Sequence, residues 1–324
     1  MVRKSVHIVF LMLVISSGMA QVPGVNPYVP ENLMKTDWSF AGQLYFTEAS
    51  SSNDLSNEFL REVNQSGFLE DDLKSGQIDK LSKVSKACIR REIGGDLFFR
   101  NNNRFWFASF SHQYVLDAQL DRDLLKLLLN GNKPYAGKTM MVPGSEYYSI
   151  YFNQLKAGIG FSMQMGELTQ TFSASIGLIA GQNYDELKVE NSSFYTHPDG
   201  DYLDVNLHAE TRLSDTSWAK FTEISGMGVG GNLYYSMLKE KNFFVSAEIK
   251  NLGFISWNKN PYTALIDTNI VFNGLEVDTT ANGNDLPDDF SFDNLRRIAF
   301  KNPEYSSFAA SLPLLFELSG GKYL

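Results

Sequence analysis

The chain has 324 residues, a length that suits one large β-domain or two smaller ones, and its formal net charge is −9. An acidic chain is repelled by phosphate backbones, so the composition argues against nucleic acid as a partner. Cys88 is the single cysteine, which excludes an internal disulfide, so packing and hydrogen bonds alone must hold the fold.

The N-terminus has the organisation of a cleaved secretory signal. Basic residues precede the apolar run Val6 to Ile15, and residues 18–20 form a small-residue cleavage site. The run is shorter than the roughly 20 residues of a membrane-spanning helix. We therefore predict a signal peptide at 1–20 and a single exported domain at 21–324. No later stretch of the chain is apolar for long enough to span as a helix, so any membrane crossing must use strands.

The first predicted elements are one strand and a helical insertion. Residues 21–37 contain three prolines and lack a regular period, and Trp38 to Thr47 form the first strand candidate. Residues 53–86 then show apolar side chains at helical spacing, first behind Asp54 and again behind a glycine. We predict two short amphipathic helices in this insertion, covering the end of a β-structure with their apolar faces.

A hairpin and a helix are predicted next. Ile89 to Arg100 and Arg104 to Leu116 flank three asparagines, which suit the positive φ values of a tight turn. Asp121 can accept hydrogen bonds from the first turn of a helix that runs to Asn130, and Gly131 can end that helix in the left-handed conformation.

Three strands with clear alternation follow. Ala157 to Met165 and Phe172 to Ala180 alternate apolar and small polar residues around a turn at Glu167 and Leu168. In Tyr202 to Leu213 one face is apolar and the other is charged. The polar face is predicted to line a lumen, with these residues: Asp204, Asn206, His208, Glu210 and Arg212.

The second half centres on Gly226 to Trp257, two alternating strands joined by a short charged turn. Its glycines superficially resemble a nucleotide-binding turn, but no helix follows them, so close packing explains them better. Residues 258–304 are predicted to be an irregular loop that hides a strand near Asp267 to Phe272 and a short helix near Phe292 to Phe300. Tyr305 to Leu324 begins a last strand, which gives about ten strands in all.

Two all-β architectures fit these strands. Alternating strands of about ten residues fit an antiparallel transmembrane β-barrel, with lipid outside and a polar lumen, and they also fit a soluble sandwich. Aromatic residues near strand ends, such as Tyr147, Tyr148 and Tyr202, favour the barrel because they suit a membrane interface. In the sandwich, the face of Leu203, Val205 and Leu207 would instead be a packed core.

Several stretches carry a family resemblance. They are Leu124 to Lys138, Glu146 to Gly160, Leu168 to Gly181 and, most specifically, the NLGFISW string that ends at Trp257, whose family-like residues are Asn251, Leu252, Gly253 and Trp257. In these the chain resembles a family of outer-membrane β-barrels of unknown function from Bacteroidota. That family is distantly similar to FadL-like channels for hydrophobic compounds and to barrels associated with type IX (Por) secretion.

The resemblance also implies a departure. Such proteins resemble complete barrels of about fourteen strands that close with an aromatic C-terminal residue, whereas this chain ends at Leu324. We therefore expect a C-terminally truncated, incomplete FadL-like or porin-like barrel, with short helices in long loops. An open edge in lipid is costly, because each unsatisfied backbone group there costs several kcal/mol.

No catalytic or cofactor chemistry is indicated. The histidines of the mature chain are widely separated and lack a nucleophile at triad spacing, and there is no phosphate-binding loop, so we expect a protein that is not an enzyme and has no cofactor. A hydrolase or acyltransferase is disfavoured because no nucleophile and base can be named. One loop has closely spaced acidic oxygens that are weak Ca²⁺ candidates: Asp278, Asp285, Asp288 and Asp289.

The expectation from sequence is therefore a non-enzymatic protein of the cell outer membrane. Its partners would be outer-membrane lipid and either a small hydrophobic molecule, for which it would be a channel, or secretion-system proteins, for which it would be a scaffold. The alternative is a soluble exported β-sandwich that binds partners through its loops.

Overall fold

A computed structural model of the chain describes the following residues: 38–56, 58–59, 62, 70–215, 223–239, 242–272 and 305–322. The predicted signal peptide, the predicted helix near residue 292 and the acidic loop with the calcium candidates lie outside this part of the chain.

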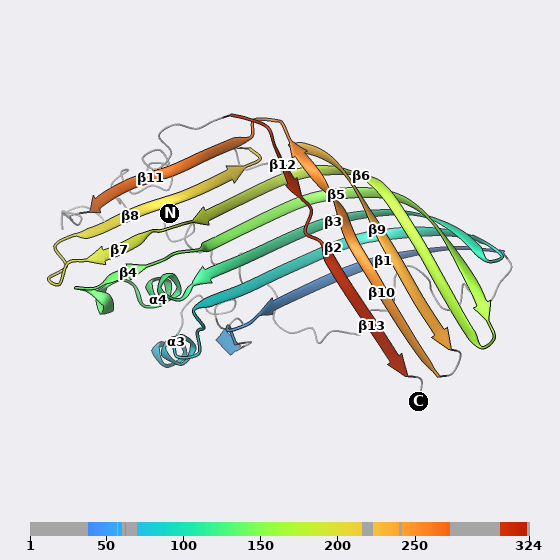
Figure 1. The fold of residues 1–324 in the computed structure, drawn as a ribbon, viewed down its shortest axis with the longest axis horizontal. Coiled ribbons are helices and arrows are strands. Elements are labelled where there is room, and N and C mark those ends of the chain that lie inside the picture. Colours follow the sequence, from blue (N-terminus) through green and yellow to red (C-terminus); the bar gives the residue numbers. More distant parts are fainter. Residues whose placement is uncertain are drawn as a thin grey trace, which may run out of the picture.

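Thirteen strands form one antiparallel sheet, which confirms the all-β prediction (Figure 1). The strands are β1 (Trp38–Ser52), β2 (Val84–Asn101), β3 (Arg104–Asp121), β4 (Thr139–Met141), β5 (Ser145–Met165), β6 (Leu168–Val189), β7 (Ser193–Thr196), β8 (Leu203–Leu213), β9 (Gly226–Lys239), β10 (Phe243–Trp257), β11 (Tyr262–Phe272), β12 (Phe308–Ser311) and β13 (Leu315–Lys322). The helices are α3 (Asp71–Ile78), α4 (Arg122–Asn130) and the 3-10 turn η2 (Lys133–Tyr135). No helix among these is long and apolar enough to cross a bilayer.

The sheet forks at β6. Strands β1, β2, β3, β5 and β6 lie side by side in that order. The first part of β6, Leu168 to Gly181, then pairs with β9, and β9 pairs with β10, which in turn pairs with β12 and β13. The last part of β6, Asp185 to Val189, pairs instead with β8, which leads to β7, β4 and β11. Figure 1 shows the two branches diverging.

A bulge at the fork lets β6 change partner. Opposite β5 the register skips Gln182, since Gly181 faces Phe152 and Asn183 faces Tyr151. The extra residue reverses which side chains of β6 point inward after it. Backbone hydrogen bonds tie both branches to this point, because Ser225 N–H donates to the Gly181 carbonyl at 2.8 Å. The described strands do not close into a ring, since β1 pairs only with β2 and β13 only with β10.

The largest apolar cluster fills the inner face beside the fork. Trp257 and Phe152 are fully buried there, and the Trp257 ring centroid lies 5.7 Å from that of Tyr184. Glycines make room for these rings, because a Cβ at Gly181 would lie 2.5 Å from Trp257 Cη2. The other members of the cluster are Val115, Ile150, Ile179, Ile255, Ala310 and Leu312.

The predicted turns and caps are present. Asn102 has φ 54° between β2 and β3, as the asparagine cluster predicts. Asp121 caps α4, since its side chain accepts the Asp123 N–H at 2.7 Å, and Gly131 follows the helix with φ 71°. The hairpins β5–β6 and β9–β10 have the predicted pairing.

Three predictions about the elements differ in part from the structure. Of the two helices predicted in the insertion, the first is helical at the described residues 58, 59 and 62, and the second is α3, which ends at Ile78, so that Val84 begins a strand instead of continuing a helical face. The strand predicted near Asp267 to Phe272 within the loop 258–304 is present as β11, which ends at Phe272 but begins earlier, at Tyr262. The count of about ten strands is too low, because β4, β7 and β12 have three or four residues each, too few for alternation to be recognised.

The packing at Gly228 is testable by adding a single methyl group. A Cβ at Gly228 would overlap the Phe254 carbonyl oxygen, so Gly228→Ala should lower the free energy of unfolding by about 1–3 kcal/mol or more. The control is Gly42→Ala, whose Cβ would meet the flexible Leu97 side chain at 3.2 Å and should cost far less. Equilibrium urea unfolding of both variants measures the difference, and equal losses would contradict this packing.

Candidate functional site

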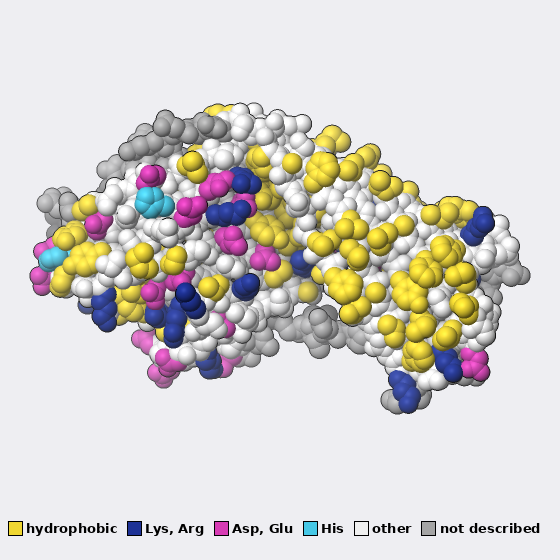
Figure 2. Space-filling model, viewed as in Figure 1, with side chains coloured by type: hydrophobic (Ala, Val, Ile, Leu, Met, Phe, Trp, Pro, Cys, Tyr) yellow, Lys and Arg dark blue, Asp and Glu magenta, His cyan; other side chains and the backbone are white. Residues whose placement is uncertain are grey.

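The outer face of the sheet is apolar across all its central strands. One row of outward residues runs in register around eight strands: Phe40, Phe99, Trp106, Ile159, Ala174, Leu233, Ile249 and Phe316. The rows beside it are similar, and the large side chains are exposed, with 91% of Leu44 and 71% of Ile176 accessible. In Figure 2 hydrophobic side chains crowd the part of the surface where β9, β10 and β13 run.

We call this surface the apolar belt. Its large exposed members are Phe40, Leu44, Phe46, Ile93, Leu97, Phe99, Trp106, Phe110, Leu155, Ile159, Phe161, Met163, Met165, Ile176, Leu178, Met227, Val229, Leu233, Val245, Leu252, Phe254, Phe316 and Leu318.

The belt ends at a polar and aromatic border on the side of the fork. There Arg91 pairs with Glu48 at 3.3 Å, and Tyr114 stacks on Tyr151 with ring centroids 4.2 Å apart. On β5 the belt extends from Leu155 to Met165, which matches the about 9–11 residues that a strand needs to cross a bilayer. Beyond the border the same strands continue into the second branch, which carries most of the charged side chains visible in Figure 2.

The inner face of the same strands is polar and buried. One inward row begins with Gln43, Asp96, Ser109 and Lys156 on β1, β2, β3 and β5. It continues with glycines on β6, β9 and β10, where an added Cβ would meet atoms of neighbouring strands, such as Lys156 Cγ at Gly177 and the Val229 carbonyl oxygen at Gly253. Asp96 and Lys156 are each 2% exposed. We define the polar layer as these inward residues: Asp96, Ser109, Ser111, Gln113, Gln154, Lys156, Asn232, Glu248, Lys250 and Asn251.

Hydrogen bonds cross the space inside the curved sheet. Asn251 Nδ2 donates to Gln113 Oε1 at 3.0 Å, joining β10 to β3, two strands that are not neighbours in the sheet. Gln113 Nε2 donates in turn to Gln154 Oε1 at 3.4 Å and to Glu92 Oε1 at 3.3 Å. The inside of this part of the sheet is therefore filled by packed polar side chains.

Asn251 reaches inward because it sits in a second bulge. It has φ 61°, and the register between β9 and β10 shifts between Ile249 and Leu252. Its backbone N–H donates to Asn232 Oδ1 at 3.1 Å. Asparagine tolerates the left-handed backbone better than most residues, so the residue type suits this position.

Charged groups of both signs are buried in the polar layer. Lys250 Nζ lies 3.0 Å from Glu317 and 3.7 Å from Glu248, whose side chain is 7% exposed. Lys156 forms no ion pair within 4 Å with any residue that the structure describes. Burying a charged side chain costs several kcal/mol unless it is paired. The charged side chains of these strands nevertheless lie inside, while the large apolar side chains lie outside.

The predicted lumen residues lie in the other branch, on β8. Arg212 pairs with Glu210 at 2.8 Å and approaches Glu186 at 3.6 Å, and the hydrogen bond with Glu210 raises the pKa of Arg212. His208 Nδ1 lies 2.9 Å from an Asp267 oxygen on β11. The structure thus brings Glu210 and Arg212 together on β8, whereas His208 pairs across to Asp267 on β11. Asp204 and Asn206 face β7 by backbone register and join neither pair.

The four family-like residues of the NLGFISW string have different structural roles in β10. Asn251 lies in the bulge, Leu252 belongs to the apolar belt and Trp257 anchors the apolar cluster at the fork. Gly253 lies where a Cβ would overlap the Val229 carbonyl oxygen. The string therefore runs from the bulge, past the apolar belt, to the apolar cluster at the fork.

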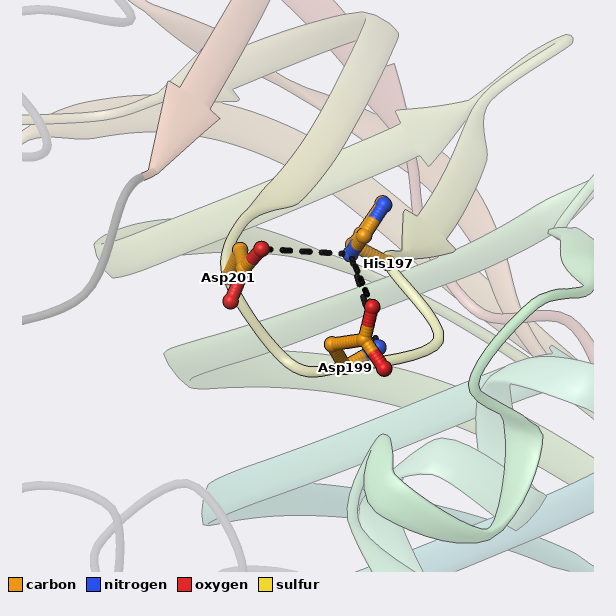
Figure 3. Close-up of side chains that lie close together, drawn as sticks. All are labelled: His197, Asp199 and Asp201. Carbon is orange, nitrogen blue, oxygen red and sulfur yellow. Dashed lines mark hydrogen bonds and ion pairs between the residues drawn. The ribbon is translucent and has the colours of Figure 1, made fainter.

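One cluster of metal-ligating residue types lies in the turn between β7 and β8 (Figure 3). His197 Nδ1 lies 3.7 Å from an Asp201 oxygen and 3.9 Å from an Asp199 oxygen. Nδ1 already accepts the backbone N–H of Asp199 at 3.4 Å, and the two carboxylates are 72% and 82% exposed. A solvated turn accounts for this arrangement without a bound cation.

Reasoning from sequence missed the buried charges. Lys156 precedes the stretch in which alternation was recognised, although it shares the inward face of Gly158 and Gly160. Glu248 and Lys250 lie in the predicted hairpin Gly226 to Trp257, whose alternation alone did not indicate buried charges. One signal could have revealed Lys156: it lies on the same face of its strand as two glycines, and glycines within a strand often mark a place where other parts of the protein approach closely.

The sequence matches a family of unknown function, DUF5723, over residues 40–322. The chain belongs to this family. No curated protein and no solved structure matches it. The DUF5723 region runs from β1 to the end of β13, so it contains both the apolar belt and the polar layer.

The buried ion pair of the DUF5723 chain gives a testable contrast. Lys250→Met should lower the free energy of unfolding by about 3–5 kcal/mol, because it leaves Glu248 buried without its cation. Adding Glu248→Gln should recover part of the loss. Lys239→Met is the control, since its partner Glu167 is 80% exposed and a surface pair contributes about 0–1 kcal/mol. Urea unfolding measures all three, and equal effects at Lys250 and Lys239 would contradict the buried layer.

Proposed function

We propose that this DUF5723 protein is a non-enzymatic outer-membrane protein that crosses the bilayer by its strands and acts as a scaffold with a packed interior. The observation that carries the proposal is the inverted polarity of its central strands. Large apolar side chains face outward, and charged side chains such as Lys156 and Glu248 are buried on the inner face of the same strands.

The apolar belt is too extensive to be left in water. Fully burying a Leu, Ile or Phe side chain is worth about 1.5–3 kcal/mol, and patches beyond a few hundred Å² usually mark an interaction surface. The belt surrounds the sheet at one level on eight strands, instead of occupying one spot. A bilayer is the partner that covers a band of this shape.

Lipid also sets a condition on the edges of the sheet. Backbone groups in hydrocarbon must be hydrogen-bonded, and each unsatisfied one costs several kcal/mol. Among the described strands, the outer edges of β1 and β13 have no strand beside them. The proposal therefore requires that both edges acquire hydrogen-bonding partners in the membrane.

The packed interior supports a scaffold over a channel for hydrophobic compounds. Three inward layers succeed one another along the strands: the rings of Phe98, Phe105 and Phe107, then the polar layer, then the cluster around Trp257. A route for an apolar solute would have to pass the buried charges of Lys156 and Glu248. Location in the outer membrane is supported by the predicted signal at 1–20.

The soluble alternative needs a second protein layer over the belt. In a soluble sandwich, outward residues such as Leu155 would pack against another sheet, but no described element covers them. In the branch with β7, β8 and β11, β8 is half-buried along most of its length, and β11 buries Tyr262, Ala264 and Ile266 on one face while its other face is exposed. We propose that this branch projects from the membrane and carries the contacts of the scaffold.

A charge placed in the apolar belt distinguishes the membrane protein from the soluble sandwich. Leu155→Arg should reduce membrane insertion, because Arg near the bilayer midplane costs about 2–4 kcal/mol. The matched control is Leu128→Arg on α4, which is similarly exposed, at 52% against 60%, and should insert normally. The readouts are heat-modifiable migration in gels and recovery in the membrane fraction. Normal insertion of both variants, or recovery of the wild type as a soluble species, would reject the membrane proposal.

The packed interior makes a separate prediction about permeability. Liposomes containing the purified full chain should swell in small sugars no faster than protein-free liposomes, because the polar layer and the Trp257 cluster leave no continuous path. An established porin is the positive control. Rapid swelling with normal insertion would reject the scaffold and leave the membrane location intact.

A further inference from the structure

A groove of about 790 Å³ is cut into the apolar belt near the hairpin ends of the strands. This volume lies within the roughly 300–1,000 Å³ of ligand sites in proteins. Its walls come from β3, β5, β6, β9, β10 and β13, and most of them are apolar: Ile159, Phe161, Phe172, Tyr235 and Phe316 are among the lining residues.

Three stacked rings give the groove a rigid wall. Phe161 and Phe172 lie 5.3 Å apart between ring centroids with an interplanar angle of 21°, and Phe172 lies 4.7 Å from Tyr235. They come from three neighbouring strands, β5, β6 and β9. Aromatic side chains packed in this way lose little freedom when a flexible chain lies against them, which favours binding.

The groove is closed toward the interior. Phe105 points inward beneath Gly160, where a Cβ would overlap its ring, and Phe105 is 4% exposed. Its contacts with Phe107 and Phe98 fill the inner face at this level. The groove therefore opens only to the outer surface, in continuity with the belt, and does not lead to the polar layer.

Arg104 is the one charged residue that lines the groove. It begins β3 directly after the β2–β3 turn, and its side chain is exposed. Within the described chain its guanidinium group forms no hydrogen bond and no ion pair, and no carboxylate lines the groove. A guanidinium at the end of an apolar groove suits a ligand with a hydrocarbon chain and an anionic head, because arginine binds phosphate through two parallel hydrogen bonds.

We infer that the groove seats an acyl chain of an anionic phospholipid, whose phosphate is bound by Arg104. This inference rests on the proposed membrane location, and it adds a selective lipid site to a belt that otherwise needs only hydrocarbon. The lipid is favoured over a protein partner because the groove is continuous with the lipid-covered belt. Its single cation lies near a hairpin end, where an outward side chain meets the level of the head groups.

The test is native mass spectrometry of the full chain in detergent, titrated separately with phosphatidylglycerol and phosphatidylcholine. One phosphatidylglycerol molecule should bind in preference to phosphatidylcholine. Arg104→Ala should weaken the binding of phosphatidylglycerol about tenfold or more, as expected for the loss of hydrogen bonds to a charged group. It should leave the weak binding of phosphatidylcholine unchanged, and Arg104→Lys should retain part of the preference.

Two further variants separate the groove from general charge effects. Lys239→Ala removes a cation near the same end of the sheet but outside the groove, and it should bind phosphatidylglycerol as the wild type does. Ala174→Trp fills the groove from an exposed position without changing the charge, and it should abolish selective binding.

The outcomes distinguish this site from the proposed function. Heat-modifiable migration should be normal in every variant, and its loss in the wild type would overturn the membrane proposal and the lipid site together. Normal migration with equal binding of the two lipids would overturn the lipid site alone. Equal weakening by Lys239→Ala and Arg104→Ala would also overturn it, because the preference would then reflect net charge.

Discussion

The structure depends on how its central strands divide their side chains between two environments. Alternation along a strand places successive residues on opposite faces, and here the usual assignment is reversed: the buried face carries Lys156, Glu248 and Asn251 and the exposed face carries Leu44 and Ile176. Buried charges are tolerable only when partners lie within reach. In the polar layer Lys250 supplies a cation to Glu248 and Glu317, and the hydrogen bond from Asn251 to Gln113 joins two strands that are not neighbours, which holds the curvature of the sheet.

The same strands serve two structures in succession. β2, β3, β5 and β6 are each longer than the belt requires, and their far ends support the branch that contains β8 and β11. The change of partner occurs at the bulge of Gln182, where the Trp257 cluster seals the inner face. One continuous set of backbone hydrogen bonds therefore couples the apolar belt to the branch that contains β8 and β11 without a linker.

Sequence patterns predict local features of this fold well and distant ones poorly. The turn at Asn102 and the cap at Asp121 follow from the preferences of single residues, and the hairpins follow from period two. The fork was not predictable, because no local signal indicates that β6 has two partners. Lys156 was missed for a related reason: it is buried beside Ser109 on β3 and Gly177 on β6, and no local signal predicts which strands pair with β5. Strands as short as β4 and β7 are stabilised by pairing with neighbouring strands and show no pattern of their own.

The bulge at Asn251 changes which residues of β10 face the interior of the sheet. Before it, the even-numbered Ser246, Glu248 and Lys250 face inward, and after it the odd-numbered Ile255 and Trp257 do. A strand without the extra residue would keep one parity along its length. It would then have to place either Trp257 or its charged side chains on the outer face of the sheet. The bulge at Asn251 thus lets a single strand place its charged residues and, farther along, its large apolar residues on the same inner face.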